Sequence, residues 1–324
     1  MPNSAVSIIP LRSIRAELAE VEQLLLEAIA AANEPLRAAL EPHLMGGKRL
    51  RAGLVLLTGS LFSAPSLPLQ RLAAAIELLH AATLVHDDII DQSDLRRGNP
   101  TLHTIWPTSV AILAGDFLLA QSVALVAELQ NPRILRSLAD GLRRVSAGEI
   151  RETLGSTGVV QGKQEYYLGT EAKTAALFAA SAAMAAMVAG AVDSTVATLA
   201  SFGRELGMAF QVVDDVLDIS ADEVTLGKPA GSDLRQGLVT LPVLLFLEQH
   251  RNTEVVTRVL EGQRGEPAIK AAVDAIRGSG SVEMAMDEAR GFADRARSIL
   301  AGFPDGVARG ELYAMVDYVV TRPA

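Results

Sequence analysis

Cysteine is absent from this chain of 324 residues. The chain can therefore form no disulfide and offers no thiolate to a metal ion, which is compatible with a reducing compartment. Aromatic residues are also scarce, at 4%, and no series of alternating segments is separated by hairpin turns, so the pattern does not favour a β-sheet. The N-terminal stretch lacks the basic region, apolar core and cleavage site of a signal peptide, and we expect a cytoplasmic protein.

An excess of positive charge is missing too. The chain carries 38 acidic and 29 basic residues, for a net charge of -9. This balance argues against a broad affinity for nucleic acid, so no nucleic-acid partner is expected. An anionic ligand would need a local basic pocket.

One uncharged stretch, Thr174 to Val192, is nineteen residues long and approaches the length of a membrane span. Alanine dominates it, and alanine gains little from hydrocarbon but favours close helix packing. We therefore predict a buried helix and no integral membrane span, with a span as the alternative.

Apolar residues recur at helical spacing through most of the chain. The clearest stretches are residues 14–44 with a break near Asn33-Glu34-Pro35, 67–91, 110–129, 198–219 and 282–300. The glycine-containing and proline-containing turns between helices are short, and no fixed-period repeat is present. We predict an all-α, single-domain helical bundle around a central cavity that spans residues 1–324, with two domains as the alternative.

Three aspartates, Asp87, Asp88 and Asp91, follow an apolar helical stretch in the pattern D-D-x-x-D. On a helix, Asp87 and Asp91 lie on the same face, where their charges repel. A lone pattern of this kind is compatible with a solvated acidic helix end.

The same pattern recurs at Asp214, Asp215 and Asp218, again after an apolar helical stretch. Two such clusters are best explained if they face one another across a cavity and are neutralised by hard cations. Mg²⁺ prefers a few carboxylates together with substrate phosphates. The sequence therefore predicts a magnesium-bound diphosphate.

Basic residues at the turns support this interpretation. Lys48, Arg49 and Arg51 follow a glycine pair, Arg96 and Arg97 precede Gly98, and Lys228 lies in "LGKPAG". Guanidinium and ammonium groups are suited to phosphate oxygens. Each of these residues taken alone is compatible with a surface charge.

The segments "GGKRLR", "HDDIIDQSDLRRGNPT", "KTAALF", "FQVVDDVLD" and "LGKPAGSDL" occur in this order. In order and spacing they resemble the trans-isoprenyl diphosphate synthases, the polyprenyl synthetase family. The resemblance runs from about Leu40 to the terminal "DYVVTR". It implies an all-α enzyme that condenses an allylic diphosphate with isopentenyl diphosphate, and a homodimer.

The resemblance also assigns roles to residues of this chain. Mg²⁺ on the allylic diphosphate would be held by Asp87, Asp88, Asp91, Asp214, Asp215 and Asp218. The same diphosphate would contact Arg96, Lys173 and Lys228, and Thr174 and Gln211 would line the reacting centre. The diphosphate of isopentenyl diphosphate would bind Lys48, Arg51, His80 and Arg97.

His80 allows two other interpretations. "ELLH" is also a Glu-x-x-His pattern, as in di-iron helical bundles, but those need a second copy that this sequence lacks. His80 could instead be a core histidine with its hydrogen bonds satisfied.

Product length in this family depends on the helix before the first cluster. The positions that would face the growing chain are Ile76, Leu79, Ala82 and Thr83. Enzymes that make the fifteen-carbon product tend to carry aromatic residues at one or both of the positions occupied here by Ala82 and Thr83. Because both residues are small, we predict a product of twenty carbons or more, with a long-chain quinone-side-chain precursor as first choice.

Leu238 departs from the family pattern, because a lysine is expected at this position. Loss of one charge-assisted contact costs about 1.5 to 3 kcal/mol, a factor of about ten to a hundred. The alternative to an active enzyme is therefore a non-catalytic or partner-dependent prenyl diphosphate-binding subunit. A class I terpene cyclase is a third possibility, but "DDVLD" does not resemble the asparagine, serine and glutamate pattern of those enzymes.

Overall fold

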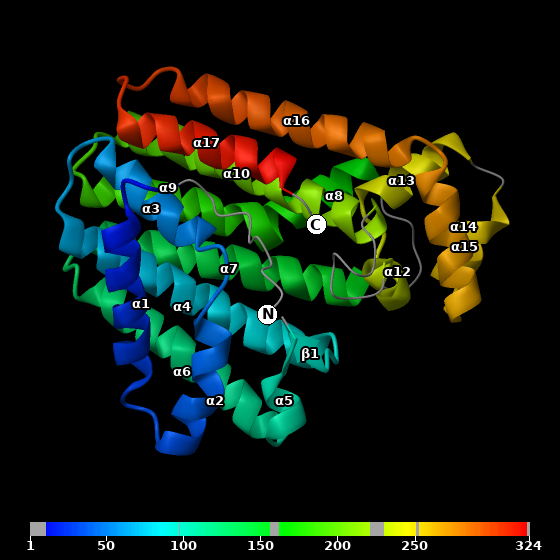
Figure 1. Ribbon diagram of the computed structural model, residues 1–324, viewed down its shortest axis with the longest axis horizontal. Coiled ribbons are helices and arrows are strands. Elements are labelled where there is room, and N and C mark those ends of the chain that lie inside the picture. The colour runs from blue at the N-terminus through cyan, green and yellow to red at the C-terminus, as the bar shows by residue number, and fades with distance from the viewer. Residues whose placement is uncertain (1–10, 97, 156–161, 221–229, 251–252, 323–324) are drawn as a thin grey trace, which may run out of the picture. The chain divides into compact units, whose positions relative to one another are not determined.

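The computed structural model describes residues 11–96, 98–155, 162–220, 230–250 and 253–322 (Figure 1). Most of this part of the chain is helical, and the predicted all-α fold is confirmed. The helices are α1 (Arg15–Ile29), α2 (Glu34–Leu44), α3 (Leu50–Ser60), α4 (Ser66–Ile90), α5 (Leu102–Ile105), α6 (Thr108–Ala127), α7 (Pro132–Gly155), α8 (Lys163–Thr170), the π-helical turn η1 (Glu171–Ala175), α9 (Ala176–Val188), α10 (Asp193–Ser220), α12 (Ser232–Gln236), α13 (Leu241–Gln249), α14 (Glu254–Leu260), α15 (Glu266–Arg277), α16 (Ser281–Leu300) and α17 (Val307–Thr321). Strands β1 (Leu95–Arg96) and β2 (Asn99–Pro100) form an antiparallel hairpin that pairs Leu95 with Pro100 and Arg96 with Asn99.

The chain divides into two compact units. Unit 1 comprises Met1–Asp140, Ala180–Gly203 and Ile299–Met315, and unit 2 comprises Gly141–Ala179, Arg204–Ser298 and Val316–Ala324. A single domain stays a prediction.

Unit 1 is organised around α4, which packs most extensively against α6 and also contacts α1, α2 and α3. Its inward-facing residues, including Leu72, Ile76 and Leu78, are fully buried. Helix α6 approaches α4 closely at Gly115, where an added Cβ would lie 2.2 Å from Nε2 of His86. Only glycine leaves room for this ring without a shift.

The predicted break in the first apolar stretch is confirmed. Helix α1 ends at Ile29, and α2 begins after Asn33, whose side chain accepts a hydrogen bond of 3.2 Å from the amide of Leu36. This is an N-cap, and Pro35 in the first turn fits because that turn leaves its amides without helical partners.

Unit 2 has its own apolar core at α12, α13, α14 and α15. The buried members include Leu234, Val243, Phe246, Val256, Ile269 and Ile276, and they pack together with Ile219 near the end of α10. Ile219 thereby joins this core to the helix that carries the second aspartate cluster.

Two described helical segments, Thr108–Ala127 and Lys163–Val188, are long and apolar enough to cross a membrane by length and composition alone. Core helices of water-soluble proteins meet the same test. Most side chains of α9 are buried, as predicted for the alanine-rich stretch.

Candidate active site

The first aspartate cluster lies at the C-terminal end of α4, in unit 1. Asp88 is buried, and its Oδ1 accepts hydrogen bonds from Nε (2.7 Å) and Nη2 (2.6 Å) of Arg96. Asp87 is partly exposed and Asp91 is exposed. The two outer carboxylates are therefore the more accessible to a cation, while the middle one binds a guanidinium of the protein.

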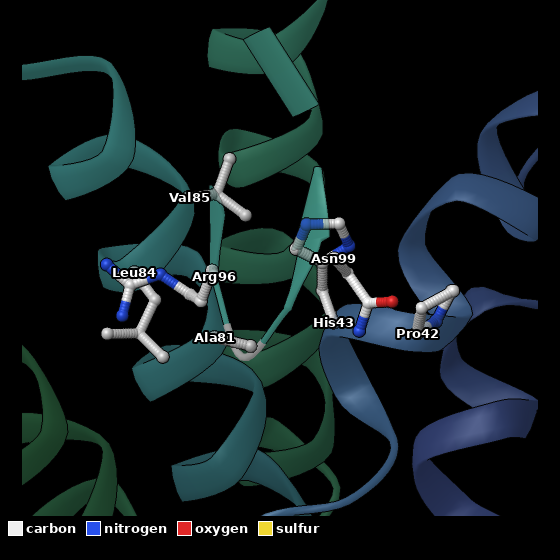
Figure 2. Close-up of a pocket in the computed structure, with 7 residues that line it drawn as sticks. All are labelled: Pro42, His43, Ala81, Leu84, Val85, Arg96 and Asn99. Atoms are coloured by element: carbon white, nitrogen blue, oxygen red, sulfur yellow. The ribbon is translucent and has the colours of Figure 1, made fainter. Parts of the chain in front are cut away.

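Arg96 reaches Asp88 from the β1–β2 hairpin, which follows α4 directly. Its side chain also lines a small pocket between α2, α4 and the hairpin (Figure 2). The other lining residues are Pro42, His43, Ala81, Leu84, Val85 and Asn99. The ion pair with Asp88 thus orients the side chain of Arg96, which we predict to bind the allylic diphosphate.

The residues predicted to bind isopentenyl diphosphate lie on two elements of unit 1. Lys48 is exposed in the turn before α3, Arg51 is partly buried in the first turn of that helix, and His80 is partly buried on α4. Arg97 and Lys228, which complete the predicted basic set, lie outside the described residues.

The second aspartate cluster lies on α10, in unit 2. Asp215 is buried, its Oδ2 accepts a hydrogen bond of 2.5 Å from the hydroxyl of Tyr166, and its Oδ1 accepts one of 2.9 Å from Nε2 of Gln211. Burial raises the pKa of Asp215 to about 7, although both hydrogen bonds act in the opposite direction. Oε1 of Gln211 in turn accepts a hydrogen bond of 2.7 Å from the hydroxyl of Thr174. Two residues predicted to line the reacting centre are thus joined to the middle aspartate.

The outer members of this cluster have different surroundings. Oδ1 of Asp214 lies 2.5 Å from Nη2 of Arg322, and this guanidinium stacks 4.1 Å from the ring centre of Phe210. Asp218 is buried, and its Oδ2 accepts a hydrogen bond of 3.1 Å from the amide of Asp233. Asp218 therefore fixes the start of α12, whereas the side chain of Asp214 remains 41% exposed.

Lys173 lies on η1, the π-helical turn between α8 and α9. Its Nζ is 3.0 Å from a carboxylate oxygen of Glu149 and 3.0 Å from one of Glu152, both on α7. Burial alone would lower the pKa of Lys173, but the two glutamates more than offset this and raise it above its usual value. The turn packs tightly on α7, because an added Cβ at Gly148 would lie 2.9 Å from Cβ of Ala172. Short π-helical segments inside helices are frequent at functional sites.

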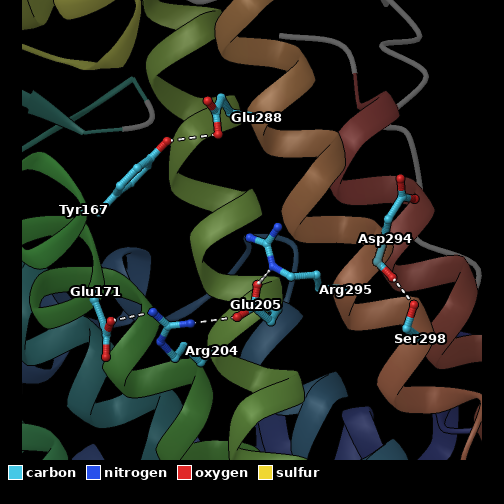
Figure 3. A network of polar contacts seen from close by, with 8 residues as sticks. All are labelled: Tyr167, Glu171, Arg204, Glu205, Glu288, Asp294, Arg295 and Ser298. Atoms are coloured by element: carbon cyan, nitrogen blue, oxygen red, sulfur yellow. Dashed lines mark hydrogen bonds and ion pairs between the residues drawn. The ribbon is translucent and has the colours of Figure 1, made fainter. Parts of the chain in front are cut away.

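Further ion pairs hold η1 in place (Figure 3). Arg204 of α10 binds Glu171 of η1 at 2.7 Å and Glu205 at 2.6 Å. Arg295 of α16 binds Glu205 at 2.7 Å. Three elements of unit 2 thereby anchor the turn that presents Lys173.

The residues predicted to set product length lie on α4 as expected. Ile76, Leu79 and Ala82 are buried, and Thr83 is partly buried with its hydroxyl bonded to the carbonyl of His80 at 2.8 Å. In the same region Ser122 of α6 donates a hydrogen bond of 2.7 Å to the carbonyl of Ala75. No bulky side chain occupies positions 82 and 83.

The sequence did not reveal several residues of these networks. Tyr166 lies in no motif quoted above, and Arg322 ends the segment "DYVVTR" without an assigned role; they lie 49 and 108 residues from their aspartate partners. Glu149 and Glu152 gave a weak signal, because carboxylates at i and i+3 share a helix face. That pattern does not identify a lysine on another element as their partner.

Comparison with known proteins identifies the family and the fold. The polyprenyl synthetase family profile matches residues 33–276. The chain belongs to the polyprenyl synthetase family. A nonaprenyl diphosphate synthase of Mycobacterium tuberculosis is 36% identical over 315 residues, which cover 96% of this chain and 93% of the relative. Component 2 of the heptaprenyl diphosphate synthase of Geobacillus stearothermophilus is 43% identical over 244 residues, covering 75% and 76% of the two chains.

This polyprenyl synthetase also matches solved structures along its length. The polyprenyl synthase of Caulobacter crescentus, crystallised with calcium and isoprenyl diphosphate, superimposes with a TM-score of 0.91 at 36% identity and 97% coverage of both chains. The resemblance recognised from the motifs is confirmed, and the chain is a prenyltransferase of the trans-polyprenyl diphosphate synthase type.

Proposed function

We propose that this polyprenyl synthetase condenses an allylic diphosphate with isopentenyl diphosphate, using Mg²⁺, to give a trans-polyprenyl diphosphate of twenty carbons or more. The observation that carries this proposal is that the aspartates within each cluster differ in burial and in their hydrogen-bond partners. Asp88, Asp215 and Asp218 are buried and accept hydrogen bonds from the protein, while Asp87, Asp91 and Asp214 are more exposed. Carboxylate oxygens at accessible positions are the donors that Mg²⁺ prefers.

In this mechanism Mg²⁺ would be held chiefly by Asp87, Asp91 and Asp214, and would offset the negative charge that develops on the departing diphosphate. Arg96 and Lys173 would bind the oxygens of that diphosphate, and their carboxylate partners keep both cations in position. The allylic C–O bond would break, releasing diphosphate and leaving an allylic carbocation. The double bond of isopentenyl diphosphate would then attack this carbocation, and a proton would be lost to the released diphosphate. Apolar side chains around the reacting carbons would protect the allylic carbocation from water.

The proposed product length follows from α4. Ala82 and Thr83 are small, so neither side chain would block a growing chain that runs along this turn of α4. The names of relatives support a long product, since they include heptaprenyl, nonaprenyl and decaprenyl diphosphate synthases. A precursor of a quinone side chain is the use we propose.

We further propose a cytoplasmic homodimer that uses α6 as its contact surface. One face of this helix exposes Ile112, Leu113 and Val123, together with the small residues Ala120 and Ala124 and one carboxylate, Asp116. A mainly apolar face on this helix suits a second copy of the same helix about a two-fold axis. Leu113→Glu should give a monomer in size-exclusion chromatography with light scattering, while Ala271→Glu on the exposed side of α15 should leave the assembly unchanged.

The alternative function is a subunit that binds prenyl diphosphates but needs a partner chain for turnover. Two observations favour it: Leu238 replaces an expected lysine, and one relative is named as component 2 of its synthase. Leu238→Lys separates the alternatives. An increase in turnover of about tenfold or more would show an impaired site, whereas an unchanged rate would show that the wild-type site works without this cation.

The decisive experiment is a product assay. The purified chain is incubated with Mg²⁺, radiolabelled isopentenyl diphosphate and a geranyl, farnesyl or geranylgeranyl primer, and the dephosphorylated products are sized by reversed-phase chromatography. A ladder that ends beyond twenty carbons supports the proposal. A stop at fifteen would contradict the product length alone, and no incorporation with any primer would favour the partner-dependent subunit.

A further inference from the structure

The turn that carries Lys48 is fastened to α4 by a buried ion pair in unit 1. Nη1 of Arg49 lies 3.3 Å from Oε2 of Glu77, and the two side chains are only 10% and 9% exposed. Arg49 has a positive φ of 47°, and it follows Gly46 and Gly47, with φ of 85° and 88°, after the single residue Lys48. A non-glycine residue in this region carries backbone strain, and such strain persists only where the surroundings hold it.

Each partner of the ion pair makes a second contact with a helix end. Oε1 of Glu77 accepts a hydrogen bond of 3.0 Å from the amide of Ala52, in the first turn of α3. Nη2 of Arg49 donates one of 2.6 Å to the carbonyl of Leu44, the last residue of α2. Backbone groups at helix ends lack partners within their helix, so these contacts satisfy an end of α2 and an end of α3. The pair thus joins three helices at one point.

The point of attachment is close to the residues predicted to bind isopentenyl diphosphate. Glu77 lies one helical turn before His80 on α4, while Arg49 lies between Lys48 and Arg51. The Glu-x-x-His pattern of the sequence therefore has a structural explanation. Both oxygens of Glu77 are engaged by Arg49 and by the amide of Ala52, which argues against a metal ligand at this position.

We propose that the Arg49–Glu77 pair is a positioning device for the diphosphate of isopentenyl diphosphate. It sets the turn and α4 at a fixed distance, so that Lys48 and Arg51 from one element and His80 from the other converge on the same diphosphate. This inference rests on the proposed function, and neither residue of the pair touches substrate. A buried ion pair is often no more stabilising than apolar residues of the same size, so its value here lies in geometry.

The test is steady-state kinetics on the full chain with Glu77→Gln and Arg49→Lys. Because a displacement of about 1 Å can cost up to a hundredfold, we expect KM for isopentenyl diphosphate to rise about tenfold or more. KM for the allylic diphosphate should stay within about twofold, since its predicted ligands lie elsewhere. Glu22→Gln is the matched control, because Glu22 contacts the same Arg49 at 3.6 Å but is 42% exposed, and both KM values should stay unchanged. Equal rises in the two KM values, or none, would overturn the proposal.

A double variant separates positioning from stability. Glu77→Leu combined with Arg49→Met replaces the pair by apolar side chains and avoids an unpaired buried charge. We expect a melting temperature at or above that of Glu77→Gln together with the same rise in KM for isopentenyl diphosphate. A wild-type KM in this variant would show that the pair serves stability alone.

Direct binding distinguishes failure of this inference from failure of the proposed function. Isothermal titration with isopentenyl diphosphate alone needs no turnover. If the wild-type chain neither binds it nor elongates any primer, the proposed function fails and this inference with it. If wild type binds and elongates while Glu77→Gln binds equally tightly, only the positioning role is refuted.

Discussion

The hydroxyl of Tyr166 donates a 2.5 Å hydrogen bond to Oδ2 of Asp215, the middle aspartate of the second cluster. Together with Gln211 on the other oxygen, it gives this buried carboxylate a donor on each side. Burial and the neighbouring Asp215 raise the pKa of Tyr166 well above its ordinary value, so the phenol stays protonated and remains a donor. The relationship predicts that Tyr166 holds the cluster in shape.

Tyr166→Phe removes this donor without changing the ring. Loss of a hydrogen bond to a charged group costs about 1.5 to 3 kcal/mol, so we expect kcat/KM to fall by about ten- to a hundredfold. Tyr167→Phe is the matched control, since its hydroxyl bonds Glu288 at 3.0 Å and no aspartate of the cluster. Equal effects of the two variants would contradict a specific role for Tyr166.

Lys173→Met removes a cation that we assign to the allylic diphosphate. We expect kcat/KM for the allylic diphosphate to fall about ten- to a hundredfold, and KM for isopentenyl diphosphate to change little. Lys163→Met on neighbouring α8 provides the comparison, because Lys163 also pairs with a glutamate, Glu288. If Lys163→Met lowered the same rate as much, loss of any cation in this unit would explain the result.

Arg322→Gln removes the guanidinium beside Asp214. The positive charge competes with a metal ion for this carboxylate, so its loss should lower the half-saturating Mg²⁺ concentration by about three- to tenfold. Initial rates across a Mg²⁺ titration measure this shift. Arg297→Gln, which loses ion pairs with Asp294 and Asp317, should leave the Mg²⁺ dependence as in wild type. A higher half-saturating Mg²⁺ concentration in Arg322→Gln would show that Arg322 matters more for orienting Asp214 than for competing with Mg²⁺.

Ala82→Phe tests the route of the growing chain along α4. A ring at this buried position would obstruct the route proposed for the growing chain, so the longest product should become shorter. Substitutions of Ala82 by Val, Leu and Phe should shorten it stepwise in the chromatographic assay. Ala81→Val is the control, since Ala81 lines the pocket of Figure 2, and it should leave product length unchanged. An unaltered ladder in Ala82→Phe would place the chain elsewhere.

Acid stability should depend on Glu288. Burial alone would raise the pKa of Glu288, but hydrogen bonds from Lys163 and Tyr167 outweigh it and hold the pKa below its ordinary 4.5. Because the folded pKa is the lower one, the stabilisation is present above pH 4.5 and is lost as the pH falls through the folded pKa. We expect Glu288→Gln to lose under about 1 kcal/mol of stability at pH 7, since the side chain is 37% exposed to solvent, and to approach wild type in strong acid. Urea unfolding at pH 7 and in strong acid measures the difference in unfolding free energy between Glu288→Gln and wild type, with exposed Glu283→Gln as the control. The same difference at both pH values would contradict the prediction.

The sequence predicted much of the local structure. The break at Asn33, the long helix that ends in Asp87 and Asp88, and the buried alanine-rich helix all follow from periodicity and capping, which are properties of neighbouring residues. The family was also recognised, because its motifs are short, contiguous and unusual in composition. Features that depend on residues close together in the sequence could therefore be predicted.

Contacts between residues far apart in the sequence could not be predicted. The two D-D-x-x-D patterns read alike at every position, yet only Asp88 is buried in the first cluster, whereas both Asp215 and Asp218 are buried in the second. Glu77 was singled out only as half of a metal-binding pattern, whereas its partners Arg49 and Ala52 lie on other elements. Which side chains pair across helices depends on packing, which periodicity alone does not specify.

The π-helical turn η1 has a consequence for the segments on either side of it. A single wide turn changes the angular phase of a helix, so α8 and α9 do not share one continuous face. Residues before the turn, such as Tyr166, therefore need not lie on the same helix face as the alanines after it. One uninterrupted stretch of chain can then direct polar groups toward the aspartates of α10 and still present small side chains for close packing.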